Sequence, residues 1–274
     1  MNSYSVLMSV YKKDKPDFLK LALESIYDNQ TRKPDEVVVV FDGPLREPLY
    51  KVLDDFQKGR EGIIKYYHQE VNSGLGQALR LGSEKCTGDY ILRMDSDDIS
   101  DPKRFEKQIA FAEAHPELDG MGCYIAEFNE DPRRERMRIR VCPTNHEDIL
   151  KMAKKRNPMN HVTACIKRSA LEKCGGYQTL LLLEDYLLWI NMITSGAKLA
   201  NLNESLVYVR VGNGFNGKRG SKERIEGWWK LQKIMIKAGM INRLQAWMNM
   251  FYIYVFVKTP NGLKELLYRY LLRK

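Results

Sequence analysis

The sequence lacks the features of a disulfide-bonded, membrane-spanning or fibrous protein. Its five cysteines are odd in number and widely spaced, with no C-x-x-C pair, which argues against zinc or redox chemistry and favours reduced thiols. An apolar run at residues 246–257 is far shorter than the roughly 20 residues that cross a bilayer. No charged leader with an apolar stretch opens the chain, so we expect a cytoplasmic protein. Heptad blocks and low-complexity runs are absent, which excludes the fibrous and disordered classes.

Three common catalytic motifs are also missing. The first apolar run ends in Ser9-Val10-Tyr11 rather than in G-x-G-x-x-G, which argues against a dinucleotide-dependent oxidoreductase. Neither G-x-x-x-x-G-K-[ST] nor G-x-S-x-G occurs, which argues against a P-loop nucleotide hydrolase and an α/β-hydrolase.

What is present is a core-forming chain of 274 residues with 44% hydrophobic and 29% charged residues, typical of soluble globular proteins. The net charge of +9 is unevenly distributed. Residues 218–274 contain 13 of the 44 Lys and Arg but only three of the 35 Asp and Glu, so the excess positive charge belongs to this tail. A basic tail attracts nucleic acid or anionic lipid, or it is the solvated face of helices.

Strand-like apolar runs alternate with helical patterns in the N-terminal half. The runs are 4–10, 36–41, 63–67 and 90–94, and the helical patterns are 18–27, 48–56 and 75–86. This β-α-β-α-β-α-β order, with four consecutive valines in the second run, predicts a parallel sheet covered by helices. Ligands of such sheets bind beyond the carboxyl ends of the strands.

The second half mixes the two patterns. We expect helices at 102–114, 147–155, 169–174 and 186–194, strands at 121–128, 137–141, 162–166 and 206–211, and helices from residue 221 onward. We therefore divide the chain into a nucleotide-binding half (1–98), an acceptor half (99–217) and a basic, apolar helical tail (218–274).

Polar residues suited to a nucleotide follow the four N-terminal strands. They are Ser9 and Tyr11 after the first strand, Asp42-Gly43 after the second, Asn72-Ser73-Gly74 with Arg80 after the third, and Asp95-Ser96-Asp97-Asp98 after the fourth. Because the carboxyl ends of parallel strands share one edge, these residues predict a binding crevice.

The acidic cluster after the fourth strand has two interpretations. Carboxylates at positions i and i+2, here Asp95 and Asp97, can approach one Mg²⁺ or Mn²⁺ that also binds a diphosphate. Alternatively, the cluster caps the helix that follows Pro102, since Asp is common at helix N-termini.

Three further groups of residues are candidates for chemistry. Glu184-Asp185 either caps the next helix or faces a cleft, where Asp185 could take a proton from a hydroxyl. His161 is either a structural residue or part of an acceptor site. The glycine-rich segment 212–220, with Arg219, either closes over a bound phosphate or forms a plain surface loop.

These motifs, in this order, resemble the family 2 glycosyltransferases of the GT-A fold. The matching residues are Ser9-Val10-Tyr11, Asp42-Gly43, Asn72-Ser73-Gly74-Leu75-Gly76 with Arg80, Asp95-Ser96-Asp97-Asp98, Gly175-Gly176-Tyr177 and Glu184-Asp185, and they span roughly residues 3–215. The resemblance implies an α/β fold with a Rossmann-like nucleotide-binding half, a mixed central sheet and, in this chain, a C-terminal helical tail.

The resemblance also implies a role for each residue. On the donor side, Tyr11 and Asp42 border the nucleoside base, Arg80 lies near the base or diphosphate, and Ser9, Asn72, Ser96 and Arg219 contribute to the nucleotide-sugar site. Asp95 contacts ribose or metal, and Asp97 ligates Mn²⁺ or Mg²⁺. On the acceptor side, Asp185 is the general base, and Glu184 and His161 belong to the acceptor site. Ser9, Lys12 and Phe41 depart from the family's usual residues, and the Q-x-x-R-W motif of its processive members is missing.

The expected reaction is a single inverting transfer from a nucleotide sugar, with UDP-sugar favoured, to a hydroxyl of a glycan acceptor. The segments 157–163 and 210–219 resemble those of bacterial surface-polysaccharide enzymes, which implies a lipid-linked acceptor and peripheral contact with the anionic inner face of the plasma membrane. The tail either lies on that membrane or packs onto the catalytic core.

The alternative function is a non-catalytic module that binds nucleic acid or membrane through the tail; for the transferase no nucleic acid partner is expected. A sugar-1-phosphate nucleotidyltransferase would need a Gly-rich basic loop after the first strand, which this chain lacks.

Overall fold

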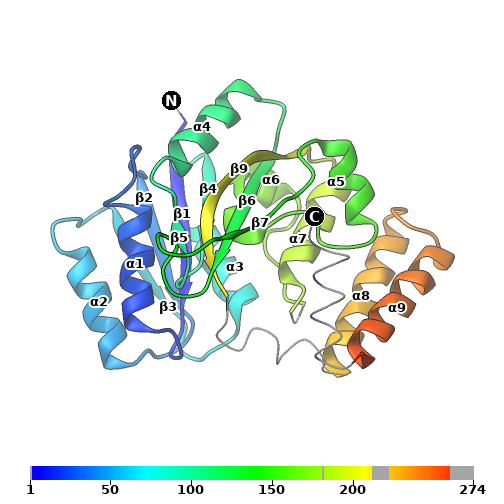
Figure 1. Ribbon diagram of the computed structural model, residues 1–274, viewed down its shortest axis with the longest axis horizontal. Helices are drawn as coiled ribbons and strands as arrows, with labels where there is room; N and C mark the ends of the chain where they lie inside the picture. The colour runs from blue at the N-terminus through cyan, green and yellow to red at the C-terminus, as the bar shows by residue number, and fades with distance from the viewer. Residues whose placement is uncertain (1, 181, 212–221, 260–274) are drawn as a thin grey trace.

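The computed structural model describes residues 2–180, 182–211 and 222–259 (Figure 1). Its strands are β1 (Tyr4–Val10), β2 (Glu36–Phe41), β3 (Ile64–His68), β4 (Tyr90–Met94), β5 (Ile99–Ser100), β6 (Gly120–Phe128), β7 (Arg138–Arg140), β8 (Cys165–Lys167) and β9 (Leu199–Arg210). Its helices are α1 (Pro16–Ile26), α2 (Glu47–Gln57), α3 (Leu75–Lys85), α4 (Arg104–Ala114), α5 (His146–Ala153), the short 3₁₀ helix η1 (His161–Thr163), α6 (Arg168–Lys173), α7 (Glu184–Thr194), α8 (Lys222–Lys237) and α9 (Arg243–Lys258).

The strands form one mixed sheet in the order β3-β2-β1-β4-β8-β6-β9-β5, with β7 paired to β6. The first four in this order are mutually parallel. β8 lies antiparallel between β4 and β6, and β6 and β9 are parallel. The predicted β-α-β-α-β-α-β half and the mixed central sheet are thus confirmed.

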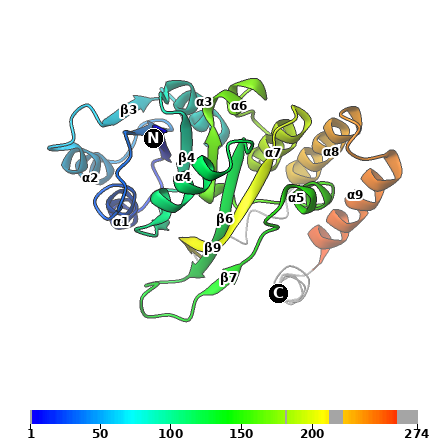
Figure 2. The same cartoon turned by 90° about the horizontal axis from the view of Figure 1, so that it is seen from above.

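Helices cover both faces of the parallel half (Figure 2). Val37 and Val39 of β2 are buried with apolar residues of α1, α2 and α4, whereas Val38 and Val40 are buried on the other face with those of α3, α6 and α7. Side chains of a strand alternate between the two faces, so a strand covered on both sides needs apolar residues at every position. This is the physical reason for the run of valines.

A third apolar cluster joins the tail to the rest of the protein. Leu231 and Met235 of α8 are buried in one cluster with Leu187 and Ile190 of α7. Of the two alternatives for the tail, packing onto the core therefore holds for α8 and for the inner side of α9. Within the described part of the chain, no helix has the length and apolar character needed to span a bilayer.

Two predicted strand boundaries were wrong in the second half, and one short strand was not predicted. Residues 162–166 form the end of η1 and the start of the short strand β8 rather than one strand. β9 begins at Leu199 instead of residue 206, and its pairing with β6 shifts register near Cys123 and Tyr124. Its first half contains Asn201, Asn203 and Glu204, which interrupt the apolar pattern on which the prediction relied. β5 has only two residues and was not predicted.

Candidate active site

The carboxyl ends of the parallel strands bring the predicted residues to one edge of the sheet. Met8 of β1 pairs with Met94 of β4, so Ser9 and Asp95 follow at the same level. Val10 pairs with Phe41, after which Asp42 follows on the other side of β1. The half-buried Ser9 therefore lies between the two acidic segments. This common edge is the expected crevice region.

Asp42 organises the turn that precedes α3. Its carboxylate accepts hydrogen bonds from Asn72 Nδ2 at 3.0 Å and from the backbone N–H groups of Ser73 at 2.6 Å and Gly74 at 3.0 Å. The turn comes so close that a Cβ on Gly43 would lie 2.6 Å from the Asn72 nitrogen, and Gly43 also has φ +80°, so only glycine is tolerated here. Asp42 and Asn72 are thus brought together, and Asp42 fixes the loop that we expect to meet the nucleoside.

The loop after β4 concentrates negative charge. Asp97 is exposed, while Asp98 is buried and accepts the backbone N–H of Arg210 at 2.8 Å. Although Asp97 can be reached by solvent, desolvation of its carboxyl group by the surrounding loops and repulsion from Asp95 raise its pKa to about 6. The same causes raise the pKa of Asp98. Asp98 therefore anchors the end of β9, and Asp97 is left as the accessible carboxylate.

The same loop is tied to the segment that follows β1. Ser96 Oγ donates to Asp14 Oδ2 at 2.8 Å, and the backbone N–H of Tyr11 donates to the same oxygen at 3.0 Å. Burial raises the pKa of Asp14 to about 6, and Asp97 and Asp95 add to the shift. Tyr11, Ser96 and Asp97 thus belong to one cluster, with Asp14 at its centre.

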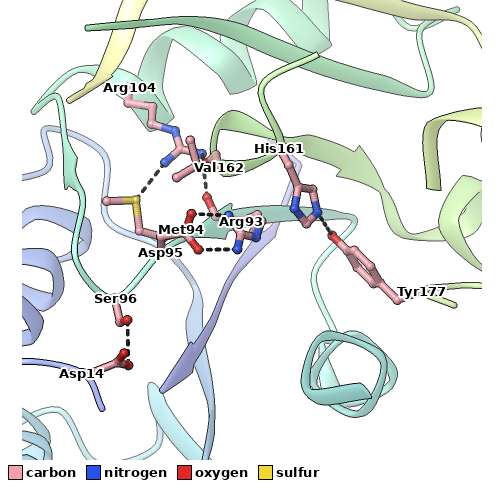
Figure 3. Close-up of polar contacts among 9 residues, drawn as sticks. All are labelled: Asp14, Arg93, Met94, Asp95, Ser96, Arg104, His161, Val162 and Tyr177. Carbon is pink, nitrogen blue, oxygen red and sulfur yellow. Dashed lines mark hydrogen bonds and ion pairs between the residues drawn. The ribbon is translucent and has the colours of Figure 1, made fainter. Parts of the chain in front are cut away.

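Arg93 occupies the floor of the site (Figure 3). It is 3% exposed, and both terminal guanidinium nitrogens donate to the two carboxylate oxygens of Asp95. Burial opposes the charge of the guanidinium, but the Asp95 carboxylate outweighs it and raises the pKa of Arg93. Its Nε is buried without a hydrogen-bond partner among the described residues. Behind it, the buried Arg104 donates to the carbonyls of Arg93 and Val162 and so joins the end of β4 to η1.

His161 lies inside the protein on the other side of Arg93. Its Nε2 is 3.2 Å from the hydroxyl oxygen of Tyr177, which is itself buried (Figure 3). Burial lowers the pKa of His161 well below its usual value, and the charge of Arg93 lowers it further. A neutral imidazole that is 9% exposed is suited to supporting the site rather than to exchanging protons with solvent.

Asp185 stands at the N-terminus of α7 with its carboxylate held in one orientation. One oxygen accepts from Asn157 Nδ2 at 2.6 Å and the other from the backbone N–H of Tyr186 at 2.7 Å. Burial raises the pKa of Asp185, while the charges of Arg93 and Arg140 act to lower it. A fixed carboxylate with increased basicity has the properties of a general base.

Glu184 begins the same helix and faces the start of α3. A Cβ on Gly76 would lie 2.9 Å from Glu184 Cγ, so the absence of a side chain at Gly76 lets the two helix N-termini approach closely. Burial raises the pKa of Glu184, and the charge of Asp185 also raises it.

One predicted residue, Arg80, is not brought into this cluster, and another lies beyond the part of the chain that the structure describes. Arg80 is exposed on α3 and pairs with Glu84 one turn along the same helix, at 3.2 Å. Arg219 and the glycine-rich segment 212–220 lie outside the described residues.

The carboxylates suit a hard divalent cation in their chemistry. No group of three or more His, Cys, Asp or Glu side chains is arranged as a metal site in the described ranges. Mg²⁺, however, is usually bound by one or two carboxylates together with substrate phosphates and water. The exposed Asp97, crowded by like charges, fits this mode, because a cation would relieve the repulsion that raises its pKa.

The comparison with known families agrees with this geometry. The family model described as "Glycosyl transferase family 2" matches residues 5–175, which includes the parallel half, the acidic loop and η1. The chain belongs to glycosyl transferase family 2. It is therefore a glycosyltransferase, and the resemblance inferred from the ordered motifs is confirmed.

Related members of the family match over most of their length. An uncharacterized glycosyltransferase of Haemophilus influenzae is 40% identical over 271 residues, which is 99% of each chain. The amylovoran biosynthesis glycosyltransferase AmsE of Erwinia amylovora is 37% identical over 85% of each chain. The Escherichia coli UDP-Gal:alpha-D-GlcNAc-diphosphoundecaprenol beta-1,3-galactosyltransferase is 32% identical over 99% of this chain and 97% of its own.

Solved structures of other glycosyltransferases share the fold. S. aureus TarS 1–349 in complex with UDP-GlcNAc has a TM-score of 0.70 at 16% identity, covering 95% of this chain and 77% of that one. The mannosyltransferase PcManGT from Pyrobaculum calidifontis, in complex with GDP-Man and Mn²⁺, has a TM-score of 0.63 at 15% identity, covering 97% and 78%. The GT-A fold expected from the sequence is confirmed.

Sequence reasoning missed three residues that the structure places in the site. Asp14, Arg93 and Asn157 hold Ser96, Asp95 and Asp185 respectively. A signal existed for Arg93: a charged residue inside a buried strand, two positions before Asp95, shares a face with it. No local pattern distinguishes Asp14 from ordinary polar loop residues. Asn157 begins the segment 157–163, which resembles surface-polysaccharide members of the family, but that resemblance assigned it no role.

Proposed function

We propose that this protein is an inverting glycosyltransferase that moves one sugar from a UDP-sugar to a hydroxyl of a lipid-linked glycan in surface-polysaccharide synthesis. The observation that carries the proposal is the convergence at Arg93. Its guanidinium binds Asp95 on the donor side and acts electrostatically on Asp185 on the acceptor side. The donor class is supported by the UDP-GlcNAc complex of TarS and by the UDP-Gal specificity named for the E. coli relative.

The residues divide into a donor side and an acceptor side. Ser9, Tyr11 and the Asp42–Asn72 turn would border the nucleoside, with Asp95 contacting the ribose. Arg80 is a candidate for the outer part of this pocket, because side-chain rotation about its long stem can exchange Glu84 for a phosphate. Glu184 would orient the acceptor beside Asp185, and the buried His161–Tyr177 pair would support the floor between the two sides.

Asp185 would take the proton from the acceptor hydroxyl. The hydroxyl oxygen then forms a bond to the anomeric carbon on the face opposite the diphosphate, and the bond from that carbon to the diphosphate oxygen breaks. This in-line displacement inverts the configuration. Asn157 and the Tyr186 N–H keep the carboxylate directed, which is the positioning that such a reaction needs.

Mn²⁺ or Mg²⁺ fits at Asp97, with Asp95 nearby. When bound, the cation would neutralise charge on the departing nucleoside diphosphate. The mannosyltransferase complex with Mn²⁺ supports a metal in this fold.

A lipid-linked acceptor requires access to a membrane surface, and α9 supplies a suitable face. The residues that share this outer face recur at spacings of three and four and are each 45–69% exposed; they are Leu244, Trp247, Met248, Phe251, Tyr252 and Val255. Lys237 and Arg243 are exposed close by. Aromatic and aliphatic side chains beside basic ones favour the interface of an anionic bilayer, so we place the enzyme peripherally at the inner face of the plasma membrane.

The first experiment is calorimetric titration of UDP, GDP, CDP, ADP and dTDP, with Mn²⁺ and then with a chelator. We expect UDP to bind in the presence of metal and to lose at least about tenfold in affinity without it. Asp97→Ala should remove the metal effect. Asp185→Asn should leave UDP binding intact and reduce transfer to a competent acceptor by about 100-fold or more.

Two outcomes of these experiments would contradict the proposal. Undiminished transfer by Asp185→Asn would show that another group is the base. Failure of every nucleotide to bind would overturn the transferase proposal and favour a non-catalytic module that uses the basic tail.

A further inference from the structure

The hairpin between β6 and β7 carries an unusual density of arginine. Five occur within eight positions: Arg133, Arg134, Arg136, Arg138 and Arg140. Figure 2 shows this hairpin projecting from the body of the molecule. The turn preceding β7 was predicted only as a charged connection, and none of the residues assigned to the donor or the base lies on it.

The arginines fall into two groups. Arg133 and Arg134 are 87% and 85% exposed and pair with Asp131 at the tip of the hairpin. Arg138 and Arg140 are two positions apart in β7 and so share one face of the strand, and Arg136 lies two positions before it. Their guanidinium groups make no hydrogen bond or ion pair with any residue that the structure describes. Three cations at alternate positions repel one another, so an anion bound beside them would stabilise the segment.

The strand leads from the surface to the proposed base. Cys142, just beyond β7, is close enough to the backbone N–H of Asn160 for that group to act against the rise that burial causes in the pKa of the Cys142 thiol, so this part of the chain lies near the segment that contains Asn157. Asn157 in turn holds Asp185 at 2.6 Å. Arg140 is close enough for its charge to act on the Asp185 carboxyl. The inner end of the arginine row therefore lies within electrostatic range of the carboxylate that would deprotonate an acceptor hydroxyl.

Apolar side chains alternate with the arginines. Ile139 and Val141 are 55% and 51% exposed, although branched aliphatic residues are usually buried in such a sheet. The segment thus presents cationic groups on one side and hydrocarbon on the other. A molecule with a strongly acidic head and a hydrocarbon chain matches both.

We propose that Arg138 and Arg140, with Arg136 beside them, bind the diphosphate of a lipid-linked acceptor whose sugar reaches Asp185. Guanidinium groups bind phosphate oxygens through paired N–H donors, and a single sugar ring separates a diphosphate from the reacting hydroxyl of the shortest such acceptor. The proposal rests on the proposed function for the role of Asp185, and it adds the element that selects the acceptor's phosphates.

The test uses the full chain and farnesyl diphosphate as the probe, with farnesol as the uncharged analogue. Arg138→Gln/Arg140→Gln is compared with the matched variant Arg133→Gln/Arg134→Gln, which removes the same charge from the tip of the same hairpin. We expect calorimetry to show a loss of at least about tenfold in farnesyl diphosphate affinity for the first variant and none for the second. Arg138→Lys/Arg140→Lys should be intermediate, because lysine keeps the charge but not the paired donors.

Several outcomes would overturn the proposal. Equal losses in both variants would mean a diffuse effect of net charge, and equal binding of farnesol would mean an apolar surface only. A loss of sedimentation with phosphatidylglycerol vesicles, without a loss of farnesyl diphosphate affinity, would assign the arginines to lipid headgroups.

Transfer assays then separate this proposal from the proposed function. With a sugar-diphospho-lipid acceptor, the Arg138/Arg140 variant should have a raised acceptor KM and an unchanged donor KM, and a phosphate-free glycoside should be used as well as by the intact enzyme. If no nucleotide binds but the farnesyl diphosphate results hold, the proposed function fails and the binding surface stands. If nucleotide binds normally and the acceptor KM does not change, the surface proposal fails alone.

Discussion

At the scale of single residues, Glu36 illustrates a charge that stabilises the fold away from the site. It is 3% exposed at the start of β2. Its carboxylate accepts hydrogen bonds from Ser5 Oγ, Lys65 Nζ and the backbone N–H of Thr87, so it connects three neighbouring strands and the turn before β4. Burial opposes ionisation, but Lys65, Ser5 and Thr87 together lower the pKa of Glu36 to about 2.

The first residue-scale prediction concerns stability against pH. A depressed pKa means that Glu36 stabilises the protein above its unfolded pKa and that this contribution is lost as pH falls from about 4.5 towards 2. Glu36→Gln should lower the free energy of unfolding at pH 7 by on the order of 2 kcal/mol. The difference from the parent should shrink steadily in denaturant titrations between pH 5 and about 2.5. A difference that is constant across this range would contradict the role given to the ionised carboxylate.

At the scale of elements, α9 has apolar residues both on the side that packs against the protein and on the side that faces solvent. Ala246 is buried in one cluster with residues of α7 and α8, and Met250, one turn further along, is also buried. Asn242 and Gln245 form a capping box that fixes the start of the helix. The opposite side carries the exposed stripe from Leu244 to Val255. A helix covered by protein on one side only would normally be polar on the other, so the outer stripe needs its own explanation.

The element-scale prediction is that this stripe contacts lipid. Leu244→Glu/Phe251→Glu should reduce co-sedimentation with phosphatidylglycerol vesicles by about tenfold or more, because two large apolar groups no longer enter the interface. Leu21→Glu, at an exposed apolar position on α1, is the matched control and should sediment like the parent. Equal behaviour of the two variants would remove α9 as the membrane-facing element.

At the scale of the whole molecule, the three apolar clusters make the tail part of the folded structure. Leu183 and Leu187 at the start of α7 are buried in one cluster with Leu231 and Met235 of α8 and Ala246 of α9. α7 also carries Asp185, so the tail supports the helix on which the proposed base is positioned.

The whole-molecule prediction is that a chain ending at residue 217 is unstable. Exposing each large side chain of the third cluster costs about 1.5–3 kcal/mol, and a typical domain is stable by only about 5–15 kcal/mol. We expect the shortened chain to aggregate or to melt at a clearly lower temperature in circular dichroism. The full chain with Leu244→Glu/Phe251→Glu, which leaves the cluster intact, should melt like the parent. An unchanged melting temperature for the shortened chain would mean that the third cluster is dispensable.

The sequence alone determined the parallel half of the fold and the edge at which the site forms. Alternating periods of two and 3.6, with an unbroken run of valines, specify strands covered by helices on both faces. Parallel strands end at one edge, so Ser9, Asp42 and Asp95 had to lie near one another. These inferences succeed because they depend on local pattern and on a topology with few alternatives.

Only the tertiary structure decided how the site is held together. Asn157 and Asp185 are 28 positions apart, and no periodicity links them. The ion pair between Arg93 and Asp95 could be anticipated only from the presence of a charged residue within the otherwise apolar strand β4. Apolar spacing in the tail could not decide between protein and lipid, because both bury the same side chains for the same reason, the removal of apolar surface from water. Packing assigned one side of α9 to the core and left the other exposed.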